Sequence, residues 1–260
     1  MSPRDATHEL AALSTTELAA LAEDAPPALL LPVGSTEAHG PHLPLATDVI
    51  IARETARRAA AALAERDRTA LLLPPLAYAV TEFVAAHPGS ISVRAATVRT
   101  LIEEIVRSLF GQGFPLVVLV NGHVEPEHAR MLKHVARDVT AAGEGTLLFP
   151  DQRLTPTVER LGEEFGRGGG HAGGYETSLV LAARPDLVDD ATRTALRPNL
   201  VDIAARLRDG ARDAAEAGGP DAWFGDPAAA TAEEGERLYG VLSGMVVDAV
   251  LAATGSETSE

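Results

Sequence analysis

An unbroken apolar stretch, PLVVLV at residues 115–120, constrains the fold more than any other feature of this chain. A strand with one solvated face alternates apolar and polar residues, whereas an unbroken run is typical of a strand buried on both faces. Shorter apolar runs predict three further strands, at 28–33, 71–76 and 146–149. Helical patterns separate these strands, at 49–66, 95–112 and 126–142. This alternation predicts an α/β fold with three layers, α/β/α, around a mainly parallel central sheet.

Four more segments are expected to be helical, at 8–23, 175–183, 199–217 and 231–253. Thr47 or Asp48 is placed to cap the helix that follows the first strand. The chain has no internal repeat and no clean linker. We therefore predict a single domain over 1–254, followed by a disordered tail at 255–260.

Composition excludes several classes of function. The chain has 260 residues, of which 46% are hydrophobic, so it can bury a full core. It has no cysteine, which excludes a disulfide framework, a thiolate metal site and a cysteine nucleophile. A net charge of −15 argues against nucleic acid as a partner. No apolar run approaches the roughly 18 residues of a membrane helix, and the N-terminus lacks a signal peptide, so we expect no membrane partner and a cytoplasmic location.

Acids and histidines follow two of the predicted strands. The stretch LPVGSTEAHGPHLPLATD, at 31–48, carries Glu37, His39 and Asp48, and NGHVE, at 121–125, carries His123 and Glu125. Each acid/histidine pair is spaced two residues apart, and in extended backbone such residues point the same way. Ligands of parallel sheets bind beyond the carboxyl ends of the strands, where the strand order reverses. The five side chains are therefore predicted to converge in one cleft.

Three carboxylates and two imidazoles exceed the needs of one zinc ion and suit two divalent ions that share a carboxylate. Two such ions with three carboxylates leave a net charge of about +1, which would lower the pKa of a bridging water toward neutrality. His171 lies in a glycine-rich segment, RGGGHAGG at 167–174, and is a candidate proton shuttle.

Each of these motifs has a plainer interpretation when taken alone. The stretch at 31–48 could be a polar surface loop, and a histidine such as His123 at a strand end is often structural. His42 and His87 are interpreted as structural or supporting residues. Glu127, His128 and His134 share a predicted helix and are expected to be solvated or capping. The glycine-rich segment is a weak candidate for phosphate binding, because it lacks a preceding strand and a Gly-Lys-Ser/Thr sequence.

Four stretches of this sequence resemble the creatininase family of metal-dependent amidohydrolases. They are GSTEAHGPHLPLATD (34–48), VNGHVE (120–125), HAGGYETS (171–178) and GDPAAATAEEG (225–235). The resemblance implies an α/β/α fold and a binuclear site that holds zinc or manganese, with iron as a further candidate. It also implies a homo-oligomer, a hexamer.

The resemblance assigns the metal ligands residue by residue. Glu37, Asp48 and His123 would bind one ion, and His39, Asp48 and Glu125 would bind the other, with Asp48 bridging both.

The resemblance also assigns His171 as the catalytic histidine. We predict Glu125 as a second catalytic group. Substrate contacts are expected from Thr81, Val124, Tyr175 and Glu176. Mycofactocin-type peptidases have two glycines where this chain has Val124 and Glu125, so Glu125 is similar to the creatinine-hydrolysing branch. The tryptophans of that branch are missing around His171, which indicates a different substrate pocket.

We therefore predict a hydrolase that cleaves a C–N amide bond, linear or cyclic, in a small-molecule substrate, with a water bridging the two ions as nucleophile. One alternative is a peptidase of the mycofactocin type that trims a short modified peptide. A second alternative is a non-catalytic small-molecule binding protein on the same fold.

Overall fold

The computed structural model describes residues 8–23, 25–167 and 170–255. Its four strands are β1 (Ala28–Val33), β2 (Ala70–Leu72), β3 (Leu116–Asn121) and β4 (Thr146–Leu148). They form one sheet in the order β2-β1-β3-β4, and every neighbouring pair is parallel. The prediction of an α/β fold with a parallel central sheet is confirmed. The second strand is shorter than the predicted 71–76, because the chain beyond Leu72 contains Pro74 and Pro75.

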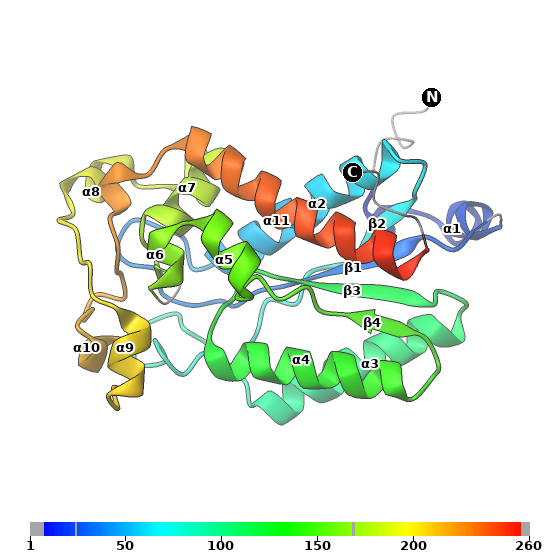
Figure 1. Cartoon of the computed structure of the whole chain (residues 1–260), viewed down its shortest axis with the longest axis horizontal. Helices are drawn as coiled ribbons and strands as arrows, with labels where there is room; N and C mark the ends of the chain where they lie inside the picture. The colour runs from blue at the N-terminus through cyan, green and yellow to red at the C-terminus, as the bar shows by residue number, and fades with distance from the viewer. Residues whose placement is uncertain (1–7, 24, 168–169, 256–260) are drawn as a thin grey trace.

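Helices cover both faces of the sheet, as Figure 1 shows. On one face lie α2 (Thr47–Ala64) and the C-terminal helix α11 (Ala232–Ala253). On the other face lie α3 (Ala95–Gly111) and α4 (Pro126–Ala141). The predicted three layers are therefore present.

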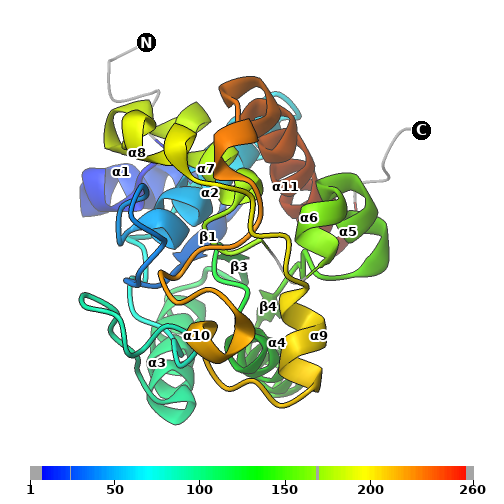
Figure 2. The same cartoon turned by 90° about the vertical axis from the view of Figure 1, so that its left-hand side faces the viewer.

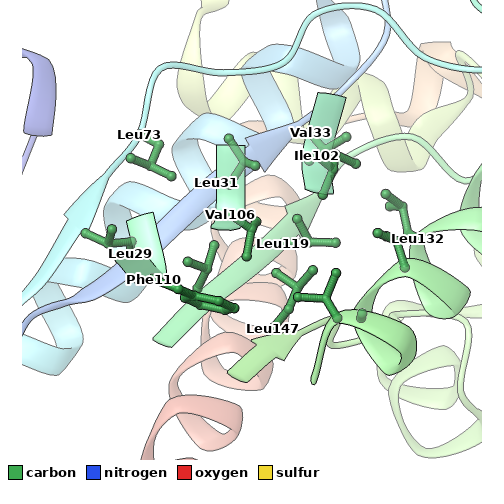
Figure 3. Close-up of a cluster of buried hydrophobic side chains, with 14 of the residues drawn as sticks. Leu29, Leu31, Val33, Leu73, Ile102, Val106, Phe110, Leu119, Leu132 and Leu147 are labelled. Atoms are coloured by element: carbon green, nitrogen blue, oxygen red, sulfur yellow. The ribbon is translucent and has the colours of Figure 1, made fainter. Parts of the chain in front are cut away.

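Alternate side chains of the buried strands feed two separate cores, because successive residues of a strand face opposite sides. Leu29, Leu31 and Leu119 pack against α3 and α4, where they meet Ile102 of α3 and Leu132 of α4 (Figure 3). Leu30, Val118 and Val120 pack on the other side against α2 and α11. There α2 presents alanines, which allow the helix to lie close to the sheet.

Shorter elements complete the chain. They are α1 (Thr15–Ala22), α5 (Thr155–Leu161), α6 (Glu163–Gly166), α7 (Gly174–Ala183), α8 (Asp190–Ala195), α9 (Ile203–Arg208), α10 (Ala214–Ala217) and the 3-10 turns η1 (Leu10–Ala12), η2 (Pro185–Leu187) and η3 (Pro227–Ala229). Figure 2 faces the end of the molecule where α9 and α10 lie. Within the described residues, no helix combines the length and the apolar character needed to cross a bilayer.

Three helix predictions need correction, and capping explains two of them. The predicted helix at 8–23 is interrupted, because Ser14 and Glu17 form a capping box that starts α1. The predicted helix at 199–217 is two short helices, because the side chains of Asp202 and Asp213 each cap a new start. Asp48 does not cap α2; it lies inside the first turn, after the uncapped Ala46.

The single domain predicted over 1–254 stays a prediction. The predicted disordered tail lies outside the described residues except for Gly255.

The strand order reverses between β1 and β3. The chain first adds β2 on one side of β1 and then returns to add β3 and β4 on the other side. The carboxyl ends of β1 and β3 consequently lie next to each other, with Val33 paired with Asn121. This is the position at which parallel sheets bind ligands.

Pro32 lies in a central strand, where a residue without an N–H is unusual. Its carbonyl accepts a hydrogen bond from Leu76 at 2.9 Å, so Pro32 faces the β2 side, whereas Val33 faces β3 and accepts from Gly122 at 2.9 Å. Because β2 pairs with β1 only as far as Leu30, the ladder does not require an N–H from Pro32.

Two glycines let the start of α2 touch both strand ends. A Cβ atom on Gly122 would lie 2.2 Å from the carbonyl oxygen of Asp48, and one on Gly34 would lie 2.5 Å from the backbone nitrogen of Val49. Neither contact leaves room for a side chain. Glycine at these two positions therefore sets Asp48 directly above the sheet.

We expect Gly122→Ala to lower the free energy of unfolding of the metal-free protein by about 1–3 kcal/mol, because the added methyl group must push α2 away from β3. Gly244→Ala is the matched control, since a Cβ atom at Gly244 in α11 meets nothing within 4 Å. It should stabilise the protein by about 0.5–1 kcal/mol through helix propensity. Denaturant unfolding measures both values, and equal stability of the two variants would contradict the close approach.

Candidate metal centre

Asp48 lies at the middle of a buried cluster of acids and histidines. Its Oδ1 is 3.2 Å from Nε2 of His39, and its Oδ2 is 2.9 Å from Nδ1 of His123. Glu37 approaches the same edge of His123, with Oε2 3.4 Å from the same Nδ1. All four side chains are buried. Glu37 and His39 come from the loop after β1, Asp48 from the first turn of α2 and His123 from the end of β3.

Glu176 completes the cluster from a third direction. It lies in the first turn of α7, is buried, and places Oε2 3.4 Å from Nε2 of His39. The donor atoms of Glu37, Asp48 and His123 lie within 4.8 Å of one another, and so do those of His39, Asp48 and Glu176. Asp48 belongs to both groups, which is the arrangement of two ions that share a carboxylate.

Glu125 is not part of either group, although the resemblance assigned it to the second ion. Its carboxylate accepts hydrogen bonds from the backbone N–H groups of Glu82 and Phe83 at 3.1 and 3.2 Å. The argument from spacing fails here because β3 ends at Asn121 and α4 begins at Pro126, so the chain between them is not a continued strand. The place expected for Glu125 beside His39 is taken by Glu176.

The donor atoms of the cluster fit divalent cations. Glu37 Oε2, His39 Nε2 and Asp48 Oδ2 are buried and lie close to groups of opposite charge, but within the part of the chain that the structure describes none of these atoms makes a hydrogen bond. Leaving such atoms unpaired away from water is costly. A set of carboxylate oxygens and imidazole nitrogens is the kind that zinc and manganese accept. Two divalent ions would satisfy these atoms and offset the buried negative charge.

The pKa values show how the cluster balances its charge with protons in place of ions. Burial lowers the pKa of His39, but the charges of Asp48 and Glu176 outweigh burial and raise that pKa to about 10. Burial raises the pKa of Glu176 to about 8. Metal binding must therefore displace protons from the cluster.

His171 lies beside the cluster, as predicted for a proton shuttle. Its Nε2 is 2.9 Å from the carbonyl oxygen of Ala38, which can only accept, so Nε2 carries the hydrogen. Its Nδ1 is left as an acceptor and lies 3.8 Å from Oε1 of Glu37. Burial and the charge of His39 lower the pKa of His171 to about 4. Its neighbours Gly168 and Gly169 lie outside the described residues.

His171 can also be viewed as a ligand, because its donor atom lies within 4.8 Å of those of Glu37 and His39. A measurement of metal content in a His171 variant separates the role of ligand from that of proton shuttle.

The other histidines divide into confirmed and corrected interpretations. His42 is a supporting residue, with Nε2 2.9 Å from the hydroxyl of Thr177, and His87 contacts the carbonyl of Pro220 at 2.9 Å. His128 is not solvated: it is fully buried, and its ring centroid lies 5.0 Å from that of His123. Its position on the apolar face of α4, three and four residues before Met131 and Leu132, is a signal that could have revealed this burial.

A cavity of about 680 Å³ opens above the cluster. Its wall is mainly apolar, with Phe83, Val124, Phe165, Ile203 and Leu207. Charged side chains of both signs line the same wall: Arg130, Arg153, Arg208 and Arg212, and Glu82, Glu125 and Glu127. Val124, for which a contact with the substrate was predicted, is therefore part of this wall.

Two other predicted substrate contacts do not line this cavity. Thr81 is fully buried, and its hydroxyl is paired with that of Ser35. Tyr175 packs its ring against Phe165 with centroids 4.8 Å apart, inside the core between α7 and α11. Their predicted role in substrate binding gains no support from this placement.

We expect Asp48→Asn to abolish binding of both ions, because both groups of ligands use this carboxylate. Glu176→Gln should lose one ion, and Glu125→Gln should keep two. Glu127→Gln, on the cavity wall and outside the cluster, is the control. Elemental analysis of purified protein gives the stoichiometry. Loss of one ion in Glu125→Gln, with two retained in Glu176→Gln, would restore the ligand set that the resemblance implied.

The comparisons with known proteins agree with this geometry. Residues 11–250 match the family model described as creatininase, creatinine amidohydrolase. A mycofactocin precursor peptide peptidase of Mycolicibacterium smegmatis is 36% identical over 221 residues, which is 82% of this chain and 80% of the relative. A creatinine amidohydrolase of Pseudomonas putida is 32% identical over 176 residues, 62% of this chain and 66% of the relative. The solved structure titled "Creatininase Mn" superposes with a TM-score of 0.72 at 25% identity, covering 95% of this chain and 98% of that one. The chain belongs to the creatininase family.

Proposed function

We propose that this chain binds two divalent metal ions and hydrolyses a C–N amide bond in a molecule of the size of a short peptide. The observation that supports the reaction is the shared position of Asp48 between two ligand groups, with His171 beside them. The observation that supports the substrate size is the cavity of about 680 Å³. That volume is in the usual range for drug-sized ligands and exceeds the needs of a single small ring.

The residues of the site have different roles in amide hydrolysis, of which the first is to bind the ions. Glu37, Asp48 and His123 would hold one ion, and His39, Asp48 and Glu176 would hold the other. When bound, the two ions would supply a water of lowered pKa and polarise the amide carbonyl.

His171 moves the proton in this scheme. Its Nδ1 is the free acceptor, so it can take a proton near Glu37 and deliver it to the leaving nitrogen, while the carbonyl of Ala38 fixes the ring. Glu125 is a second proton carrier in the cavity wall, since burial raises the pKa of its carboxyl.

A small cyclic amide is the second candidate substrate. Glu125 favours it, because this residue lines the cavity and is the feature that resembles the creatinine-hydrolysing branch. The missing tryptophans and the large cavity argue for the longer substrate.

We further infer that the ions are zinc or manganese, that the chain assembles into a homohexamer, and that it acts in the cytoplasm. The nitrogen and oxygen donors support the choice of metals. Exposed apolar side chains near the site, those of Leu45, Tyr78 and Ile91, are available for contacts between subunits.

A substrate panel tests the proposal. With zinc or manganese loaded, we expect hydrolysis of short peptides with apolar residues to exceed that of lactams and creatinine, because only longer molecules reach the apolar wall. Chelated protein and Asp48→Asn are the controls. Turnover of lactams alone would select the second candidate. Saturable binding without any hydrolysis would select the non-catalytic alternative.

We expect His171→Asn to lower kcat by about 10²–10⁴, the usual contribution of a general acid or base, while both ions and the melting temperature are retained. The loss should shrink for activated anilides, whose leaving groups need no proton. Steady-state kinetics and elemental analysis on the same samples provide the measurement. Loss of an ion would make His171 a ligand, and full activity on unactivated amides would remove it from the mechanism.

A further inference from the structure

The carboxylate of Glu164 binds two separate backbone segments near His171. Its Oε1 accepts a hydrogen bond from the N–H of Tyr175 at 2.7 Å, and its Oε2 accepts one from Asp226 at 2.9 Å. Tyr175 lies in the first turn of α7, where the helix itself offers no acceptor. A carboxylate is favourable at such a helix start, because the N–H groups and the helix dipole attract negative charge.

Glycines make this approach possible. A Cβ atom on Gly225 would lie 2.2 Å from Oε2 of Glu164, and Cβ atoms on Gly170 and Gly173 would each lie 2.7 Å from Oε1. Gly170 and Gly225 also have positive φ angles, of 56° and 75°. The glycine-rich composition around His171 is therefore explained in part by a carboxylate around which the chain closes.

The two segments bound by Glu164, around Tyr175 and around Asp226, both connect to the backbone of His171. The N–H of Gly173 bonds to the carbonyl of Gly170 at 2.6 Å, which forms a turn around His171. The carbonyl of His171 accepts from Phe224 at 2.8 Å, two residues before the N–H of Asp226.

The turn also contains a strained residue. Ala172 has a left-handed φ of 53°, a conformation that residues with a Cβ atom rarely adopt, and its N–H bonds to Oε2 of Glu176 at 2.7 Å. Glu176 thus holds the turn on the side of the metal cluster, and Glu164 holds the two chain segments behind it.

We propose that Glu164 is a positioning residue that fixes His171 relative to the metal cluster through these two backbone contacts. The inference rests on the proposed function for the role of His171. Glu164 does not line the cavity above the cluster and lines a separate pocket with Gly170 and Gly225, so it acts through the backbone and not on the substrate. Proton transfer depends steeply on geometry, and a displacement of about 1 Å can cost about 10² in rate.

The first test compares Glu164→Ala, Glu164→Gln and Glu163→Ala. Glu163 is the matched control: it is adjacent and exposed, and its carboxylate is paired with the side chain of Arg167. Glu164→Ala should lower kcat by about 10² with little change in KM or metal content. Glu164→Gln keeps one acceptor and should lose about tenfold. A loss of metal in Glu164→Ala would overturn the proposal, because Glu164 would then act on the ligands.

A double-mutant cycle separates positioning from general stability. If Glu164 acts through His171, Glu164→Ala should cause no further loss of kcat in the His171→Asn background. A cost that persists unchanged in that background would overturn the proposal. Melting temperatures of all variants show how much of each effect is loss of folded protein.

The third readout needs no activity. Amide hydrogen exchange at Tyr175 and Asp226 should become faster in Glu164→Ala and stay unchanged in Glu163→Ala. NMR signals of the His171 ring nitrogens should shift in the first variant only. If the wild-type protein hydrolyses no amide, the proposed function fails, and these signals still decide on positioning. Unchanged exchange and unchanged ring signals would overturn it.

Discussion

The buried charge of Asp48 is the constraint on which the rest of the site depends. A carboxylate in the interior is tolerated only if positive charge and hydrogen-bond donors surround it. Here two histidines approach its two oxygens, and the carboxylates of Glu176 and Glu37 face the same ring nitrogens of those histidines. Without ions, the cluster offsets its negative charge only by holding protons, because the pKa values of His39, His123 and Glu176 are all raised. Divalent ions would take the place of these protons, so the buried charge that a metal-free protein must compensate is the feature that favours metal binding.

The sheet supplies the geometry that this cluster needs. Because the strand order reverses between β1 and β3, two chain segments far apart in the sequence leave the sheet side by side. The start of α2 lies directly on both, with glycines at the two contacts. Its N-terminal dipole adds partial positive charge where Asp48 lies. The third contribution comes from α7, whose first turn carries Glu176 and follows the turn of His171.

Sequence reasoning recovers what depends on local pattern and loses what depends on distant neighbours. The strands and the long helices follow from apolar periodicity, and Glu37, His39, Asp48 and His123 follow from their positions after strands. Glu125 was expected beside His39, but Glu176 lies there instead. The sequence does not reveal this difference, because it depends on where β3 ends and on how α7 packs against the rest of the fold. The stretch HAGGYE did contain a signal, since its mixture of acid, histidine and glycine resembles the 34–48 loop. Glu164 offered none, because its meaning comes from glycines in two other segments.

Pro32 has a consequence for the accuracy of the metal centre. A slip of one residue between β1 and β3 would turn Pro32 toward β3, where the ladder requires the N–H that proline lacks. It would also move the loop that carries Glu37 and His39 by about 3.3 Å, more than the length of a metal–ligand bond of about 2 Å. The missing N–H of Pro32 thus disfavours the misaligned pairing. The register of β1 and β3 is therefore set already in the metal-free protein. The distances between the metal-binding side chains follow from this register.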